Sequence, residues 1–104
     1  MTLEQFRATL AQKAAPQEVS PALRAMWEDA KGNWNEAHSI AQEIEDQTGW
    51  WIHAYLHRKE GDLGNAAYWY RRAGQPTAHD TLDEEWDRIV LSLLGAGPAV
   101  LNHE

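Results

Sequence analysis

Two histidines at helical spacing carry the clearest chemical potential in this sequence. His53 and His57 lie four residues apart in the segment 50–60, WWIHAYLHRKE, and residues at that spacing share one face of a helix. Both imidazoles could bind one metal ion, or act as general acid and base, because an unperturbed imidazole pKa lies near 6.5. Zinc usually takes three or four protein ligands. His38 and Glu60 are conceivable additional ligands, although their spacing does not require it.

A structural role explains the same two histidines without any ligand. Ala54 follows His53, whereas the metalloprotease motif has a glutamate there. The favoured interpretation is that His53 and His57 hydrogen-bond to tyrosine, glutamate or backbone groups inside a stack of helices. Ser39 directly follows His38, and neighbours in a helix point to different sides, so no nucleophile is paired with a base. We therefore predict no catalytic residue, no bound metal and no cofactor.

The aromatic residues indicate a contact surface. The chain holds six tryptophans in 104 residues, and a core of this size cannot bury all of them fully. We expect Trp27 and Trp51 to be partly exposed, since tryptophan is frequent where proteins bind partners. On a helix over 50–60, Trp51, Tyr55 and Arg58 follow one stripe, and Arg58 could pair with a carboxylate of a partner.

Capping residues and the helical period of the apolar side chains predict an all-α chain. Three helix N-termini are indicated by Thr2 with Gln5, Ser20 with Pro21, and Thr81 with Glu84. Glycines stand where helices could end, at positions 32, 49, 61, 74 and 95. We predict six helices, at about 3–13, 21–31, 34–46, 50–60, 63–73 and 82–94, followed by a short irregular tail over 96–104.

An internal repeat organises the middle of the chain. The segment from Ala25 to Ala37 recurs from Ala54 to Ala66, with an offset of 29 residues. Each copy has an alanine, a glycine seven positions later, Asn or Asp, a large apolar residue, two variable positions and a second alanine. The glycine ends one helix and the small alanines let the next helix approach closely. The repeat therefore predicts two antiparallel helix pairs.

The second copy resembles a tetratricopeptide repeat. The matching residues are Ala54, Gly61-Asp62-Leu63-Gly64-Asn65-Ala66, Tyr70, Ala73 and Pro76, with Trp50 in place of the first large aromatic. The run 66–74, AAYWYRRAG, is also similar to the Sel1-like variant of that repeat. The resemblance covers about 21–76, as units of about 21–47 and 50–76. Helices over about 3–13 and 82–94 would cap them within one domain of residues 1–104.

This resemblance implies a right-handed stack of helices with a concave groove. It would place Trp51, Tyr55 and Arg58 towards the groove and turn His53 and His57 inward. The period of 29 residues is shorter than that of the family, which leaves the superhelical curvature open.

Our main hypothesis is a module that binds a protein, a peptide or a second copy of the chain. Its predicted binding residues are Trp27, Trp51, His53, Tyr55, His57 and Arg58. The alternative is a small-molecule or metal pocket, conceivably enzymatic, built from His53, His57 and Arg58.

The overall charge argues against one class of partner. The formal net charge is −7 with the histidines neutral, and phosphate backbones repel a protein of that sign. We therefore expect no nucleic acid as a partner. We expect no membrane as a partner either, because no apolar run approaches the roughly 20 residues that span a bilayer. The chain has no cysteine and its N-terminus lacks the pattern of a secretory signal. Both observations favour a cytoplasmic location.

Overall fold

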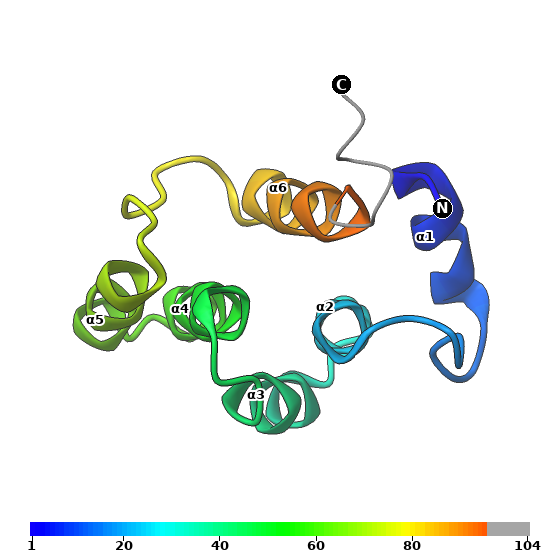
Figure 1. Cartoon of the computed structure of the whole chain (residues 1–104), viewed down its shortest axis with the longest axis horizontal. Coiled ribbons are helices and arrows are strands. Elements are labelled where there is room, and N and C mark those ends of the chain that lie inside the picture. Colours follow the sequence, from blue (N-terminus) through cyan, green and yellow to red (C-terminus); the bar gives the residue numbers. More distant parts are fainter. Residues whose placement is uncertain (96–104) are drawn as a thin grey trace.

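The structure, a computed structural model, describes residues 1–95 and is all-helical over that range. Over that range the chain forms six α-helices, with a short 3₁₀ turn (Thr9–Ala11) after the first. Figure 1 shows how the helices are arranged. The helices are α1 (Leu3–Ala8), α2 (Pro21–Ala30), α3 (Trp34–Gln42), α4 (Gln47–Glu60), α5 (Leu63–Ala73) and α6 (Leu82–Leu94). The predicted all-α class is confirmed. The prediction of an irregular tail over 96–104 lies outside the described residues.

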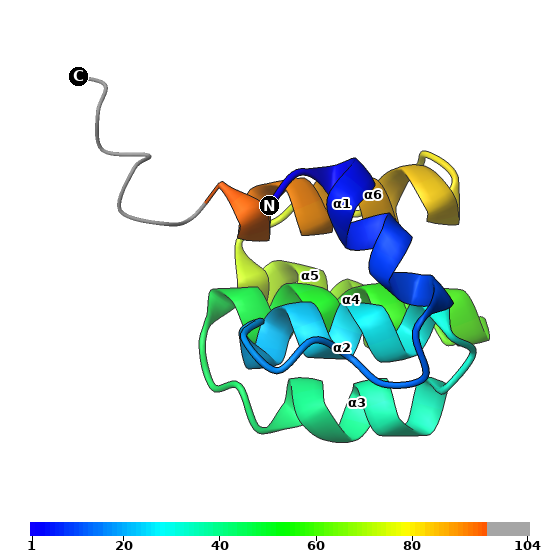
Figure 2. The ribbon, with the colours of Figure 1, turned by 90° about the vertical axis from the view of Figure 1, so that its right-hand side faces the viewer.

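The four central helices form two packed pairs, α2 with α3 and α4 with α5. In the view of Figure 2 these four run side by side, while α6 lies along one side of α2 and α4 and α1 packs next to α6. Helix α3 also packs on α4, and α6 contacts α1, α2 and α4. The pairs are those that the repeat predicts. Their stacking in the manner of tetratricopeptide repeats stays a prediction.

The alanines of the repeat lie at the contacts within the pairs. Ala25 and Ala37 are completely buried between α2 and α3, as are Ala54 and nearly all of Ala66 between α4 and α5. Side chains this small allow helix axes to come close. At the turn of the second pair, Gly61 has a φ of 92°, a left-handed conformation that glycine adopts at little cost.

The main core lies where α1 and α6 cover α2 and α4. Phe6 of α1 packs against the ring of Trp86 of α6, with centroids 5.9 Å apart, and Met26 and Ile52 are completely buried. Trp27 belongs to this core as well, because it is only 2% exposed. Its indole N–H donates to the hydroxyl of Thr9 over 3.2 Å. The prediction that Trp27 is partly exposed is therefore wrong.

The predicted N-terminal caps are all present. Thr2 with Gln5 and Thr81 with Glu84 each form a reciprocal capping box, and the Ser20 hydroxyl accepts from the backbone N–H of Leu23. Such a cap satisfies backbone donors that have no partner inside the helix. Local sequence therefore determines where α1, α2 and α6 begin.

Helix α4 begins three residues before the predicted position, and α3 ends earlier than predicted. Asp46, expected to end one helix, instead caps the next through a 3.0 Å bond from the Gly49 N–H to its carboxylate. Gly49 itself lies inside the first turn of α4. A Cβ there would stand 2.0 Å from the carbonyl oxygen of Ile44. This glycine is needed for close approach rather than for a helix end.

Helix α1 is also shorter than predicted. Regular helix gives way to the 3₁₀ turn that ends at Ala11. The Lys31 ammonium group then donates to the carbonyls of Leu10 and Gln12 over 2.7 and 3.2 Å. This long-range contact satisfies carbonyls that a continued helix would have used, and no local signal indicates it. Within residues 1–95 we also find that every helix is too short or too polar to cross a bilayer.

Candidate metal centre

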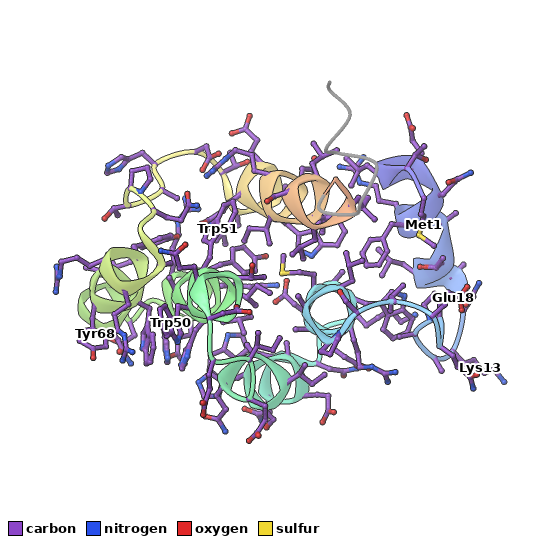
Figure 3. All side chains as sticks on the ribbon, viewed as in Figure 1. Met1, Lys13, Glu18, Trp50, Trp51 and Tyr68 are labelled. Atoms are coloured by element: carbon purple, nitrogen blue, oxygen red, sulfur yellow. The ribbon has the colours of Figure 1, made fainter. Side chains whose placement is uncertain are left out.

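The predicted contact stripe of α4 faces the protein's own helix α6. Figure 3 shows Trp51 pointing from α4 towards α6. Arg58 donates to the carboxylate of Glu85 over 2.7 Å, and the indole N–H of Trp51 donates to the same group over 3.3 Å. Tyr70 donates to it as well, at 2.7 Å. Glu85 is completely buried, so the carboxylate that Arg58 was expected to find on a partner is supplied by this chain.

Tyr55 is equally unavailable to a partner. It is 2% exposed, and its hydroxyl donates to the carboxylate of Asp29 on α2 over 2.9 Å. The Lys59 ammonium group donates to the other oxygen of that carboxylate over 2.9 Å. Burial and the adjacent Asp29 carboxylate raise the pKa of Tyr55 above its usual value. Tyr55 and Arg58 therefore join helices inside the molecule, which corrects their predicted role as groove contacts.

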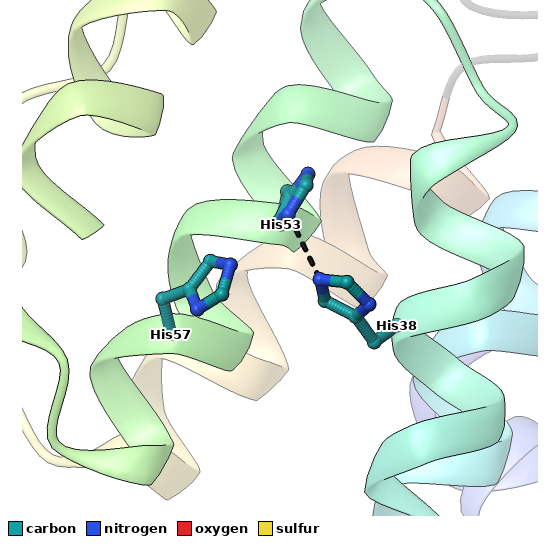
Figure 4. A group of neighbouring side chains, drawn as sticks. All are labelled: His38, His53 and His57. Carbon is teal, nitrogen blue, oxygen red and sulfur yellow. Dashed lines mark hydrogen bonds between the residues drawn. The ribbon is translucent and has the colours of Figure 1, made fainter. Parts of the chain in front are cut away.

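The histidines face the other side of α4, where a third imidazole meets them. Figure 4 shows His38 of α3 pointing towards His53 and His57 of α4. The Nε2 atoms of His38 and His53 are 3.0 Å apart. One ligand nitrogen from each of the three rings can be chosen so that all three lie within 4.8 Å of one another. Arg58 takes no part in this cluster, so the predicted pocket of His53, His57 and Arg58 is corrected to three histidines.

Aromatic stacking holds the three rings in place. His53 stacks on Trp69 of α5 at a centroid distance of 4.1 Å and on His57 at 4.8 Å. His38 stacks on Trp34 at 4.9 Å, and the Trp34 indole N–H donates to the carbonyl of Leu56 over 2.9 Å. Three helices thus restrict the rotamers of the cluster. A preorganised set of ligands loses less side-chain entropy on binding an ion.

His57 has two further polar neighbours near the α4–α5 turn. Its Nδ1 lies 2.7 Å from the Glu60 carboxylate, and its Nε2 lies 3.4 Å from the Asn65 side-chain nitrogen. Both neighbours belong to the repeat unit over α4 and α5, one at each side of Gly61. His57 is itself 8% exposed.

Burial favours the neutral forms of His38 and His53. Removal from water, reinforced by the imidazoles of His38 and His57, lowers the pKa of His53 to about 4. Burial and the neighbouring His57 also lower the pKa of His38. Desolvation disfavours the charged form of an imidazole, and two nearby imidazoles disfavour it further. Neutral imidazoles carry the lone pair that a metal ion needs.

The dimensions of the cluster fit a small transition-metal ion. Zn–N bonds of 2.0–2.1 Å in a tetrahedral site hold two nitrogens about 3.3 Å apart. The 3.0 Å between the Nε2 atoms of His38 and His53 is close to that value. The three ligand nitrogens all lie within 4.8 Å of one another, so a small movement of the rings would be enough to bring them around one ion. The donor set is therefore suitable for an ion of this class.

Sequence reasoning found the histidines but missed what surrounds them. His53 and His57 were singled out by spacing, and His38 was only one conceivable partner. The two rings that flank the cluster, Trp34 and Trp69, were not among the predicted binding residues. One signal was available, because Trp34 and His38 on α3 share the four-residue spacing of His53 and His57 on α4.

Comparison with known proteins does not identify a family. No family model matches the chain, and neither the curated proteins nor the solved structures provide a match. The resemblance to tetratricopeptide repeats therefore stays a prediction, and the chemistry of the site is the basis for assigning a function.

Proposed function

We propose that this protein binds a divalent transition-metal ion through the imidazoles of His38, His53 and His57. The observation that carries the proposal is the convergence of three ligand nitrogens, all within 4.8 Å, from two different helices. Lone histidines on a helix surface are common, but three buried or half-buried rings meeting edge to face are a ready ligand set. The ion would bridge α3 and α4, and so join the two helix pairs.

The ligand type favours zinc, copper, nickel or iron. Imidazole nitrogen suits these ions, whereas magnesium and calcium prefer oxygen ligands. Three protein ligands leave at least one coordination position for water or another ligand. The chain contributes no thiolate, because it has no cysteine. The imidazole ligands have no redox chemistry of their own, and the open position would be accessible to water or a substrate.

Titration of tag-free protein with Zn²⁺ and Co²⁺ tests the proposal. We expect one ion per chain by calorimetry, and visible absorption of bound Co²⁺ that indicates low coordination. Changing His38 to glutamine should weaken binding by removing one of three nitrogens. His38 is the half-buried member of the cluster, so this substitution disturbs the core least. Changing His53 to glutamine should weaken binding as well.

His79 provides the matched control. It is an exposed histidine in the segment between α5 and α6, so replacing His79 by glutamine removes an imidazole without touching the cluster. Binding by this variant should equal that of the unchanged protein. Equal affinity of the unchanged protein and the His38→Gln variant would exclude the three-histidine site.

A separate surface supports a second candidate function, contact with another polypeptide. Trp50, Tyr68 and Trp69 surround the guanidinium of Arg72, with its carbon 4.5 Å from the Trp50 ring centroid, 5.9 Å from that of Tyr68 and 5.2 Å from that of Trp69. Tyr68 is 45% exposed. Figure 3 shows Trp50 and Tyr68 on the side of α4 and α5 that faces away from α6. Exposed aromatic and arginine side chains are enriched among the residues that dominate binding energy.

Self-association is the directly testable form of this second function. Sedimentation velocity over a range of protein concentrations should show a dimer that the Tyr68→Ala variant weakens. Replacing Arg24 by alanine, an exposed arginine on α2, provides the control. A chain that sediments as a monomer at every concentration would exclude self-association, and leave a peptide as the partner to be tested.

A further inference from the structure

The polar neighbours of His57 determine which of its two nitrogens is free to bind a ligand. A neutral imidazole carries one proton, so one nitrogen donates a hydrogen bond and the other accepts. An ionised carboxylate only accepts, and the nitrogen of an asparagine amide only donates. Nδ1 of His57 faces the Glu60 carboxylate at 2.7 Å, and Nε2 faces the Asn65 amide nitrogen at 3.4 Å.

We infer that Glu60 is the positioning residue of the cluster, because it holds the proton of His57 on Nδ1 and leaves the lone pair on Nε2. Figure 4 shows that Nε2 is the nitrogen of His57 that is turned towards His38 and His53. Its role in metal binding depends on the function proposed above. In such a site Glu60 fixes the orientation of the ring and makes Nε2 more basic, as carboxylates beside metal-bound histidines do.

Asn65 and the metal ion compete for the same lone pair. The contact of 3.4 Å is long for a hydrogen bond, so it costs little to give up. On binding, Nε2 of His57 would exchange its contact with the Asn65 amide for the ion, and the Nδ1–H of His57 would continue to donate to the Glu60 carboxylate. The hydrogen bond between His38 and His53 must also be lost, because both of its Nε2 atoms become ligands. Whichever of these two rings accepts in that bond already has its lone pair on Nε2, as His57 does, and the ring that donates would have to move its proton to Nδ1.

The position of Glu60 separates this role from a structural one. Its side chain is 38% exposed, and it is the last residue of α4 before the glycine turn. A single hydrogen bond to a partly exposed carboxylate contributes little to stability. A change of Glu60 should therefore alter His57 and its ligand affinity without unfolding the protein.

Nitrogen-15 NMR of the histidine side chains tests the inference in the metal-free protein. At pH 7.5 we expect His57 to carry its proton on Nδ1. In the Glu60→Ala variant the same ring should become a mixture of the two tautomers. In Glu60→Gln the amide oxygen still accepts from Nδ1, so the original tautomer should persist. The Glu45→Ala variant removes an exposed carboxylate elsewhere in the chain and should leave the spectrum of His57 unchanged.

Metal affinity provides the second measurement. Loss of a carboxylate next to a ligand histidine lowers affinity by about 10- to 100-fold, and we expect this for Zn²⁺ and Glu60→Ala. Glu60→Gln should weaken binding less, and Glu45→Ala not at all. Two results would overturn the inference and leave the three-histidine site standing. One is a proton on Nε2 of His57 in the original protein, and the other is a Glu60→Ala variant that binds Zn²⁺ as tightly as the original protein. If Zn²⁺ binds to no variant and not to the unchanged protein, the proposed function is wrong, and with it the role of Glu60 in a metal site.

Discussion

The buried polar groups on the two sides of α4 are paired in opposite ways. Towards α6, donors meet acceptors: Arg58 and Tyr70 both reach the completely buried carboxylate of Glu85. Towards α3 and α5, imidazole meets imidazole: His53 stacks on His57, His38 contacts both of them edge to face, and tryptophan rings flank the cluster. We refer to these as the carboxylate side and the histidine side.

This difference in pairing indicates a separate role for each side of α4. On the carboxylate side every strong donor is matched, and the network ties α4, α5 and α6 together, so it contributes to the fold. On the histidine side one proton is shared between His38 and His53, and a buried group of neutral bases gains little from such pairing. Neutral imidazoles that meet one another offer their lone pairs to a cation, because imidazole nitrogen is a suitable ligand for zinc, copper, iron and nickel ions.

Removal of Arg58 should produce the largest effect on stability. In Arg58→Ala the Glu85 carboxylate stays buried and keeps only neutral donors. Breaking a buried ion pair in this way costs about 3 kcal/mol, which corresponds to a fall in Tm of about 10 °C or more for a domain of this size. Urea denaturation measures the free energy of unfolding directly. Zn²⁺ affinity should not change, because Arg58 lies on the carboxylate side.

The Arg24→Ala variant is the control, since Arg24 is exposed on α2. Its free energy of unfolding should stay within about 0.5 kcal/mol of the unchanged protein. If Arg58→Ala unfolds at the same urea concentration as Arg24→Ala, the network around Glu85 is not structural, and Arg58 returns as a candidate contact for a partner.

The histidine side should make the metal-free protein sensitive to acid. In the unfolded chain His53 titrates near 6.5, whereas in the folded protein its pKa is about 4. Between these values the unfolded state binds more protons, so the free energy of unfolding falls as pH is lowered from 6.5 to 4. The loss levels off below pH 4, where the folded form also takes up the proton. We expect His53 to account for about 2 kcal/mol at the lower end.

Comparison with a His53→Gln variant isolates this part of the pH dependence. Its stability should fall less steeply over the same pH range, while the exposed His79→Gln variant should follow the unchanged protein. Identical slopes for all three proteins between pH 6.5 and 4 would mean that His53 is not held neutral by burial. Added Zn²⁺ should steepen the dependence for the unchanged protein, because protons and the ion compete for the same nitrogen atoms.

The sequence predicts much of this fold because its signals are local. Capping at Thr2, Ser20 and Thr81, the glycine turn at Gly61 and the alanine repeat each depend on residues a few positions apart. The helix stripes of α4 were also separated correctly, with histidines on one side and Arg58 on another. These features follow from helical periodicity alone.

The predictions that were wrong concern contacts between distant segments. Burial of Trp27 depends on Thr9, and the pairing of Arg58 depends on Glu85 in the final helix. The helical period of α6 gave no indication of this partner, because Glu85 stands among the acidic residues of its first turn, where such residues usually face solvent. Helix α6 covers the side of α4 that carries Trp51 and Arg58. A pattern within one pair of helices cannot reveal what covers the pair.

The smallest predicted effect tests whether the two sides of α4 are independent. Tyr55→Phe removes one hydroxyl from the carboxylate side and leaves Asp29 with its bond from Lys59. Loss of one buried hydrogen bond costs about 1 kcal/mol, which urea denaturation can resolve. Because the Tyr55 ring and its packing are kept, Zn²⁺ affinity and the tautomer of His57 should match those of the unchanged protein. If the change in Zn²⁺ affinity is larger than the loss of stability explains, α4 transmits strain from one side to the other. The metal site would then depend on the network around Asp29.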